Sequence, residues 1–429
     1  MATSKPNADS VLKSQQQLSL VGAVAIGLAS MLGAGVFFVW SSAWSLAHDG
    51  IYLAALLAAA VASLNAASVY QLASNNSRPG GIYSYSRQHL NPATAFVAGI
   101  AFVFGKIGSI AAIALIIDHY VNSAFALPNP AGHLAAIVTI AALFALNVLG
   151  INRTALVAGI LASVTLLFLL FSIGSAFQHG SPTHMSVGVH GGKGILAAAS
   201  LLFFAFAGYA RVATLGDEVR ESRRNIPRAI VISLAVVIAV YFAIVVALFG
   251  FENPGNEATS DAPFVQMLAR TAPNLNSNVV IFVVVIAALG SMLALLAGTA
   301  RTAATMAADG ELPKLLAKRN KFGAPYLVES MIALTAIGFV IWSEQTWIVI
   351  GFSSFSVLLY YAIGHLAVLA QPKEQRKQPR IVAILGFALC AVLVLSVPGP
   401  AVGASTAILV IALLIRSISS RLAGRAKRN

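Results

Sequence analysis

Charged residues and cysteine are both scarce in this chain of 429 residues. Asp, Glu, Lys and Arg make up 10 % of it and hydrophobic residues 58 %, a balance that excludes a soluble domain of this length. Cys390 is the only cysteine, so the sequence holds no disulfide framework, CxxC pair or cysteine metal site. No pattern indicates a catalytic nucleophile with its base. We therefore expect a protein that is not an enzyme and that holds neither a metal nor a cofactor.

Long apolar runs fill most of the chain, and its mean hydropathy is +0.84. About 20 apolar residues are enough for a helix to cross a bilayer. Twelve runs approach or exceed this length, at residues 18–42, 48–72, 93–118, 132–149, 154–177, 194–216, 229–250, 277–300, 326–343, 346–369, 381–397 and 401–416. The first is too long for a cleaved signal peptide and follows a polar arm. The sequence predicts an all-α integral membrane protein with twelve transmembrane helices.

The net charge of +13 follows the predicted topology. With the N-terminus inside, all but four of the 27 Lys and Arg residues fall in cytoplasmic segments. The four exceptions are Lys106, Lys193, Arg211 and Arg270. The positive-inside rule accounts for this asymmetry, so the charge indicates contact with membrane lipid and not with nucleic acid. We expect a multi-pass protein of the cell inner membrane with both termini in the cytoplasm.

Two of the apolar runs carry a glycine break at mid-depth, at Gly33-Ala34-Gly35 and at Phe206-Ala207-Gly208-Tyr209. A helix in lipid tolerates a break only where the freed backbone groups face protein, water or a ligand. Breaks at matching places in two halves are typical of secondary transporters with inverted repeats. The predicted organisation is a cytoplasmic polar arm (1–17), a first five-helix repeat (18–177), an exterior loop (178–193), a second five-helix repeat (194–369), two additional helices (381–416) and a basic cytoplasmic tail (417–429).

The two breaks are candidate binding elements for a small zwitterion. N–H groups that start the outer half-helix after Gly33 favour an anion such as a carboxylate, and carbonyl groups at a helix end suit an ammonium group. Phe204, beside the second break at Gly208, is the aromatic ring we expect to cover a ligand. Small residues also let helices pack closely, so the alternative interpretation is that the glycines only provide space for helix packing.

Lys106 lies near the middle of the third run, where a charge costs at least about 3 kcal/mol. Burial disfavours the charged form of a lysine, which makes Lys106 a candidate for coupling proton movement to transport. Arg211 lies near the cytoplasmic end of its run, and we interpret it as snorkelling to the interface. His365 in the tenth run is expected to be hydrogen-bonded within the bundle.

Four stretches resemble the amino acid–polyamine–organocation (APC) superfamily, in its bacterial amino acid permease branch. They are MLGAGVF at 31–37, RPGGIYSY at 78–85, FFAFAGY at 203–209 with DEVR at 217–220, and MAADGELP at 306–313. The resemblance covers nearly the whole chain and implies a LeuT-like fold, with a 5+5 inverted repeat and broken helices 1 and 6. It implies that Ala34 and Gly35 donate N–H groups to a substrate carboxylate. Met31 and Ala207 would offer carbonyl groups to the substrate ammonium, with Phe204 as the gate.

The chain also departs from the pattern of that superfamily. Ala210 stands where many relatives carry a glutamate, and Thr165 stands where some proton-coupled relatives carry a lysine. Lys106, which matches a position beside the pocket in relatives, is then the one deeply placed cation, and Leu295 replaces the tryptophan of arginine exchangers. The sequence predicts transport of neutral amino acids by alternating access with proton symport.

Three alternatives stay open. One is an exchanger of amino acids or amines, and another is a sodium-coupled carrier that uses the hydroxyl groups of Thr165, Ser291 and Thr299. The third, from another class, is a channel or membrane receptor, although no run is polar along one face as a pore requires.

Overall fold

The computed structural model describes residues 18–33, 35–76, 78–125, 133–148, 151–179, 191–216, 218–250, 263–343 and 345–426. Every regular element in this part of the chain is a helix, and the only extended pairing there is an isolated bridge between Leu18 and Val219. By length and composition, eight described helical stretches can cross a membrane, and the first of them, Leu20–Asn75, contains several helices. The all-helical membrane architecture agrees with the sequence. The count of twelve spans and the inverted repeat remain predictions.

Each of the twelve predicted runs overlaps at least one helix. The first half holds α2 (Leu20–Met31), α3 (Gly35–Ala47), η1 (His48–Gly50), α4 (Ile51–Asn75), α5 (Ile82–His89), α6 (Pro92–Phe125), α7 (Leu134–Val148) and α8 (Ile151–His179). The second half holds α9 (Gly192–Phe206), η3 (Ala207–Tyr209), α10 (Ala210–Ala213), α11 (Ser222–Phe249), α13 (Pro263–Thr271), α14 (Ser277–Ala308), η4 (Lys314–Ala317), α15 (Tyr326–Trp342), α16 (Thr346–Ala370), η5 (Lys373–Gln375), α17 (Arg380–Ser396) and α18 (Gly399–Ala426).

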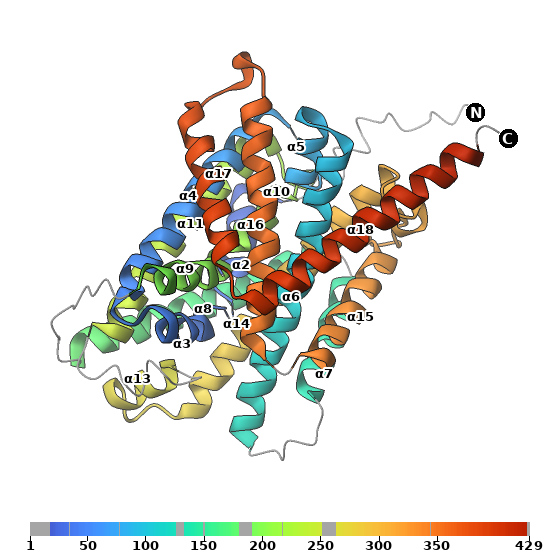
Figure 1. Ribbon diagram of the computed structural model, residues 1–429. Coiled ribbons are helices and arrows are strands. Elements are labelled where there is room, and N and C mark those ends of the chain that lie inside the picture. Colours follow the sequence, from blue (N-terminus) through green and yellow to red (C-terminus); the bar gives the residue numbers. More distant parts are fainter. Residues whose placement is uncertain are drawn as a thin grey trace, which may run out of the picture.

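Helix α6 forms the centre of the bundle and packs against α14 and α16 (Figure 1). Its apolar residues point in all directions and nearly all are buried, as expected of a helix enclosed by other helices. Helix α18 instead runs obliquely along the outside of the bundle and leaves most of its apolar side chains exposed (Figure 1). Its exposed apolar surface suits contact with lipid tails.

Several helices extend beyond their predicted ends, and α14 and α18 extend furthest. Helix α14 continues to Ala308 although its apolar run ends at residue 300, and α18 continues to Ala426 although its run ends at residue 416. The predicted boundary between the last span and the basic tail is therefore not the end of a helix. Hydropathy marks where apolar residues stop, whereas a helix stops only where its backbone hydrogen bonds do. The polar arm at 1–17 lies outside the described residues.

Candidate functional site

The first predicted break lies between α2 and α3. Helix α2 ends at Met31, because Leu32 leaves the helical conformation (φ −81°, ψ 42°) after its N–H has bonded to the Leu28 carbonyl at 2.7 Å. Helix α3 begins at Gly35, and the Gly33 carbonyl accepts the N–H of Val36 at 3.1 Å. The chain is thus interrupted where its glycines predict. Ala34, a predicted carboxylate donor, lies outside the described residues.

The second predicted break is a change of helix type. Helix α9 ends at Phe206, residues Ala207–Tyr209 form the 3₁₀ turn η3, and α10 continues for only four residues to Ala213. The backbone is tightened here and not unwound, since a 3₁₀ turn bonds each N–H to the carbonyl three residues before it. The half-helix beyond this break is accordingly a single turn.

Glycines let the two breaks pack closely against each other and against α14. A Cβ atom on Gly208 would lie 2.3 Å from the carbonyl oxygen of Ser30, and one on Gly33 would lie 2.2 Å from the side chain of Ser291. A Cβ atom on Gly35 would lie 3.0 Å from the ring of Phe204. These glycines therefore do allow close packing, as the alternative interpretation of the breaks expected.

A small cavity lies where the breaks meet. Its lining consists of Ser30, Met31, Gly33, Gly35, Lys106, Ser109, Ile113, Phe204, Ala205, Gly208, Ser291 and Leu295. Six of the eight predicted site residues are in this lining. The space open to the centre of a water-sized probe is about 10 Å³, room for about one water molecule. An amino acid fits only if the surrounding helices move apart.

Lys106 reaches the cavity from the middle of α6, and 2 % of the residue is exposed. Its Nζ donates a hydrogen bond to the carbonyl of Ala207 in the second break at 3.0 Å. No carboxylate among the described residues pairs with it or lines the cavity. Ala207, the seventh predicted residue, is thus joined to the site through Lys106.

Tyr241 on α11 is a site residue that the sequence did not reveal. Its hydroxyl group lies 2.5 Å from the carbonyl of Met31 and 3.2 Å from that of Ala205. The contact joins α11 to both breaks, across 210 positions of sequence in the case of Met31. A buried tyrosine in an apolar run has no periodicity or motif that distinguishes it from the core.

Arg211 does not snorkel to the interface, as the sequence suggested, but is buried in the bundle. The residue is 1 % exposed, and its guanidinium donates to the hydroxyl group of Thr214 at 2.6 Å instead of snorkelling to the interface. A Cβ atom on Gly298 would lie 2.3 Å from Cδ of Arg211, so this glycine of α14 makes room for the buried side chain. The wrong interpretation came from counting residues to the end of an apolar run.

His365 is hydrogen-bonded within the bundle, as expected. Its Nδ1 lies 2.7 Å from the hydroxyl group of Ser68, and its Nε2 lies 2.7 Å from Oδ1 of Asn65. The thiol group of Cys390 donates to the same Asn65 oxygen at 3.2 Å. These groups join α4, α16 and α17, and none of them lines the cavity.

The three hydroxyl groups considered for a sodium site do not converge. Thr165 donates to the carbonyl of Leu161 and Thr299 to that of Leu295, each one turn earlier on its own helix. Ser291 alone lines the cavity, and it donates to the carbonyl of Ser30 at 3.4 Å. Within the described ranges, no group of three or more His, Cys, Asp or Glu residues is placed to hold a metal ion.

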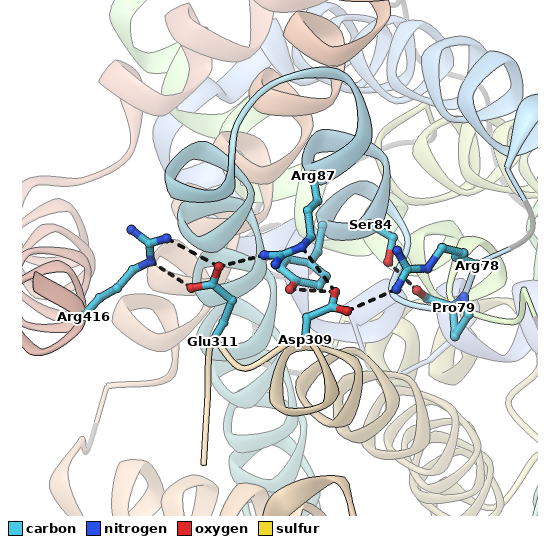
Figure 2. A network of polar contacts seen from close by, with 8 residues as sticks. Arg78, Pro79, Ser84, Arg87, Asp309, Glu311 and Arg416 are labelled. Carbon is cyan, nitrogen blue, oxygen red and sulfur yellow. Dashed lines mark hydrogen bonds and ion pairs between the residues drawn. The ribbon is translucent and has the colours of Figure 1, made fainter. Parts of the chain in front are cut away.

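A chain of ion pairs lies at the end of the bundle that is predicted to face the cytoplasm (Figure 2). Asp309 lies 3.1 Å from Arg78 and 3.7 Å from Arg87, and Glu311 lies 2.7 Å from Arg87 and 2.8 Å from Arg416. Burial alone would raise the pKa of Glu311, but hydrogen bonds from Arg416 and Arg87 hold that pKa below its ordinary value. The ion pairs join α5 and the segment before it to the segment after α14 and to α18.

The start of α2 is fixed at the same end of the bundle. The N–H of Leu18 donates to the carbonyl of Glu218 at 3.0 Å, and the N–H of Arg220 donates to the carbonyl of Leu18 at 2.9 Å. Glu218 in turn forms a buried ion pair with Arg301 of α14. The segments that lead into the first break and out of the second are therefore held together.

Comparison with known proteins agrees with this architecture. The family model of amino acid permeases matches residues 18–418. An uncharacterized transporter of Mycobacterium tuberculosis is 36 % identical over 418 residues, which cover 96 % of this chain and 93 % of that protein.

Two relatives from Bacillus subtilis have named substrates. A branched-chain amino acid permease is 23 % identical and covers 85 % of this chain and 83 % of its own length. A methylthioribose transporter is 25 % identical, and the match covers 75 % of this chain and 74 % of that transporter. Because the family model spans nearly the entire sequence and the mycobacterial transporter matches it over almost its full length, the chain belongs to the amino acid permease family of the APC superfamily.

Proposed function

We propose that this protein is a secondary active transporter that moves small amino acids, or carboxylates of their shape, across the inner membrane by alternating access. The observation that carries the proposal is the cavity between the two interrupted helices, which is lined by the glycines of both breaks and by Lys106. Interruptions of this kind in matching helices are typical of substrate sites at the membrane midplane.

The solute carboxylate is proposed to bind at the first turn of α3. N–H groups in a first helical turn have no partner within the helix, and the helix dipole favours an anion there. Ala34 and Gly35 would supply these groups, and Phe204 would cover the ligand. The aliphatic side chains of Ile113 and Leu295 favour a neutral, apolar solute, in line with the substrate named for the branched-chain relative.

Proton symport through Lys106 is the proposed coupling. Its position in the cavity, without a paired carboxylate in the described part of the chain, makes a permanent charge costly. A lysine that gains and loses its proton as the site opens to alternate sides avoids that cost and links the proton to the solute. Arginine does not release its proton in this way, so Lys106→Arg should also be impaired.

Alternation requires that the contacts at the predicted cytoplasmic end break and reform. The cavity has room for about one water molecule, so solute must enter through a state in which α2 and α10 have moved away from their neighbours. The Glu218–Arg301 pair and the ion pairs around Asp309 and Glu311 are the contacts we expect to open.

Purified protein in liposomes tests the proposal. Counterflow of labelled amino acids should reveal exchange, and an imposed pH gradient should drive accumulation. Lys106→Ala should keep some exchange but lose accumulation, while Lys193→Ala, an exposed lysine at the start of α9, should retain both. Accumulation by Lys106→Ala under a pH gradient alone would contradict the coupling role.

The same liposomes distinguish the alternatives. Accumulation that follows a sodium gradient and ignores pH would indicate the sodium-coupled carrier. Uptake only against internal substrate would indicate the exchanger. A channel would pass solute without saturation or counterflow, and a receptor would bind solute without moving it.

A further inference from the structure

The carbonyl groups assigned to a substrate ammonium already have donors from the protein. Lys106 Nζ occupies the carbonyl of Ala207 at 3.0 Å, and the Tyr241 hydroxyl occupies that of Met31 at 2.5 Å. Lys106 thus places an ammonium group at one of the two carbonyl groups that the family resemblance assigns to the α-ammonium of an amino acid. An amino acid would bring its own ammonium group to such a site, whereas here the side chain of Lys106 supplies one.

The remaining polar groups of the cavity favour an anion. Its described lining contains one ammonium group, no carboxylate and no second titratable side chain. The hydroxyl groups of Ser30 and Ser109 bond to the Ile26 carbonyl and to Ser353, each at 2.7 Å. On the other side of the break, Gly35 at the start of α3 lines the cavity and its N–H has no partner within the helix, whereas the N–H of Val36 already donates to the Gly33 carbonyl. A carboxylate in the cavity would therefore meet the ammonium group of Lys106 on one side and an N–H group at the start of α3 on the other.

We propose that the cavity prefers a carboxylate without an α-ammonium group, the 2-oxo or 2-hydroxy counterpart of an aliphatic amino acid, to the amino acid itself. The inference rests on the proposed function, because it takes the same cavity as the solute site. A second ammonium group beside the Ala207 carbonyl would meet the charge of Lys106, with no carboxylate in the described lining to offset the repulsion. A carboxylate without that group neutralises Lys106 instead.

This assignment also fits the proposed coupling. A proton on Lys106 and a bound carboxylate stabilise each other, so the two occupy the site together and cross as a neutral pair. The ammonium group of an amino acid and the protonated Lys106 instead repel each other at the Ala207 carbonyl. Symport through Lys106 therefore favours a solute that lacks the ammonium.

Leucine and 4-methyl-2-oxopentanoate, which differ only at the α-carbon, test the inference on the full-length protein. Dissociation constants in detergent and counterflow in liposomes are measured for both. The wild type should bind the oxo acid about tenfold or more tightly than leucine. Lys106→Met should reverse the order, since it removes the cation and frees the Ala207 carbonyl. Lys106→Arg should keep the order if the charge decides it, and Lys193→Met is the matched control outside the cavity.

Tighter binding of leucine by the wild type overturns the inference and leaves the proposed function standing. An unchanged order in a folded Lys106→Met protein, judged by its thermal unfolding, overturns it as well. Binding of neither compound also overturns it, and counterflow of a wider amino acid panel then shows whether the proposed function fails too. The comparison in the wild type decides the question even if no Lys106 variant folds.

Discussion

Replacing Gly208 by alanine should separate the two breaks. The added Cβ atom would lie 2.3 Å from the Ser30 carbonyl oxygen and 2.4 Å from its carbon, whereas ordinary van der Waals contact begins at 3.4 Å. The main chain at Ser30 must therefore retreat by about 1 Å, and overpacking of this kind costs about 1–3 kcal/mol. The obstacle is main-chain atoms, which cannot turn away as a side chain can, so we expect the upper part of that range.

Thermal unfolding in detergent and counterflow in liposomes measure the effect. The matched control is Gly338→Ala in α15, where a Cβ atom meets nothing within 4 Å. Alanine is favoured over glycine by about 1 kcal/mol inside a helix, so the control should unfold at the same or a higher temperature and still transport. If Gly208→Ala matches its control in both assays, the close contact of the breaks does not limit the protein, and the reasoning from the cavity fails.

Three further outcomes are expected. Gly35→Leu should insert into the membrane but lose ligand-induced thermal stabilisation, because a Cβ atom there already lies 3.0 Å from the Phe204 ring; unchanged stabilisation would leave the glycine a packing role only. Glu311→Gln should lower stability by about 1 kcal/mol at neutral pH. Because its partners hold the pKa of Glu311 below the ordinary 4.5, that difference should shrink in thermal melts as the pH falls below about 4.5; a difference independent of pH would refute this account. A cysteine at Arg78 in a Cys390→Ala background should react with impermeant maleimide only in inside-out vesicles, and labelling in intact cells would overturn the topology.

The break positions were predictable because their cause is local. A glycine weakens the helix at its own position, so Gly33, Gly35 and Gly208 mark the interruptions without any knowledge of their neighbours. The membrane character was predictable for a similar reason, since it depends on composition over about 20 residues. The burial of Lys106 at the cavity could be anticipated because a charge at mid-depth is costly wherever the rest of the chain lies.

The partners of these residues were not predictable. Lys106 and Ala207 are 101 positions apart, and Met31 and Tyr241 are 210 apart, so only the packing of whole helices brings them together. Arg211 was misread for the same reason: its burial depends on the space left by Gly298 in α14, and not on its distance from the end of an apolar run. The ion pairs of Glu311 likewise join three segments that no local pattern connects.

The two interpretations of the glycines turn out to be compatible. Gly208 and Gly35 allow the breaks to touch, and that contact places the start of α3 and the Lys106 ammonium, which donates to the Ala207 carbonyl, at one small cavity. Close packing is thus the means by which polar groups from separate helices reach the same point. Because the space holds about one water molecule, the proposed function requires the contact to loosen when solute enters and to reform behind it. Residues that pack the breaks in the closed state are therefore the ones whose replacement should alter both stability and transport.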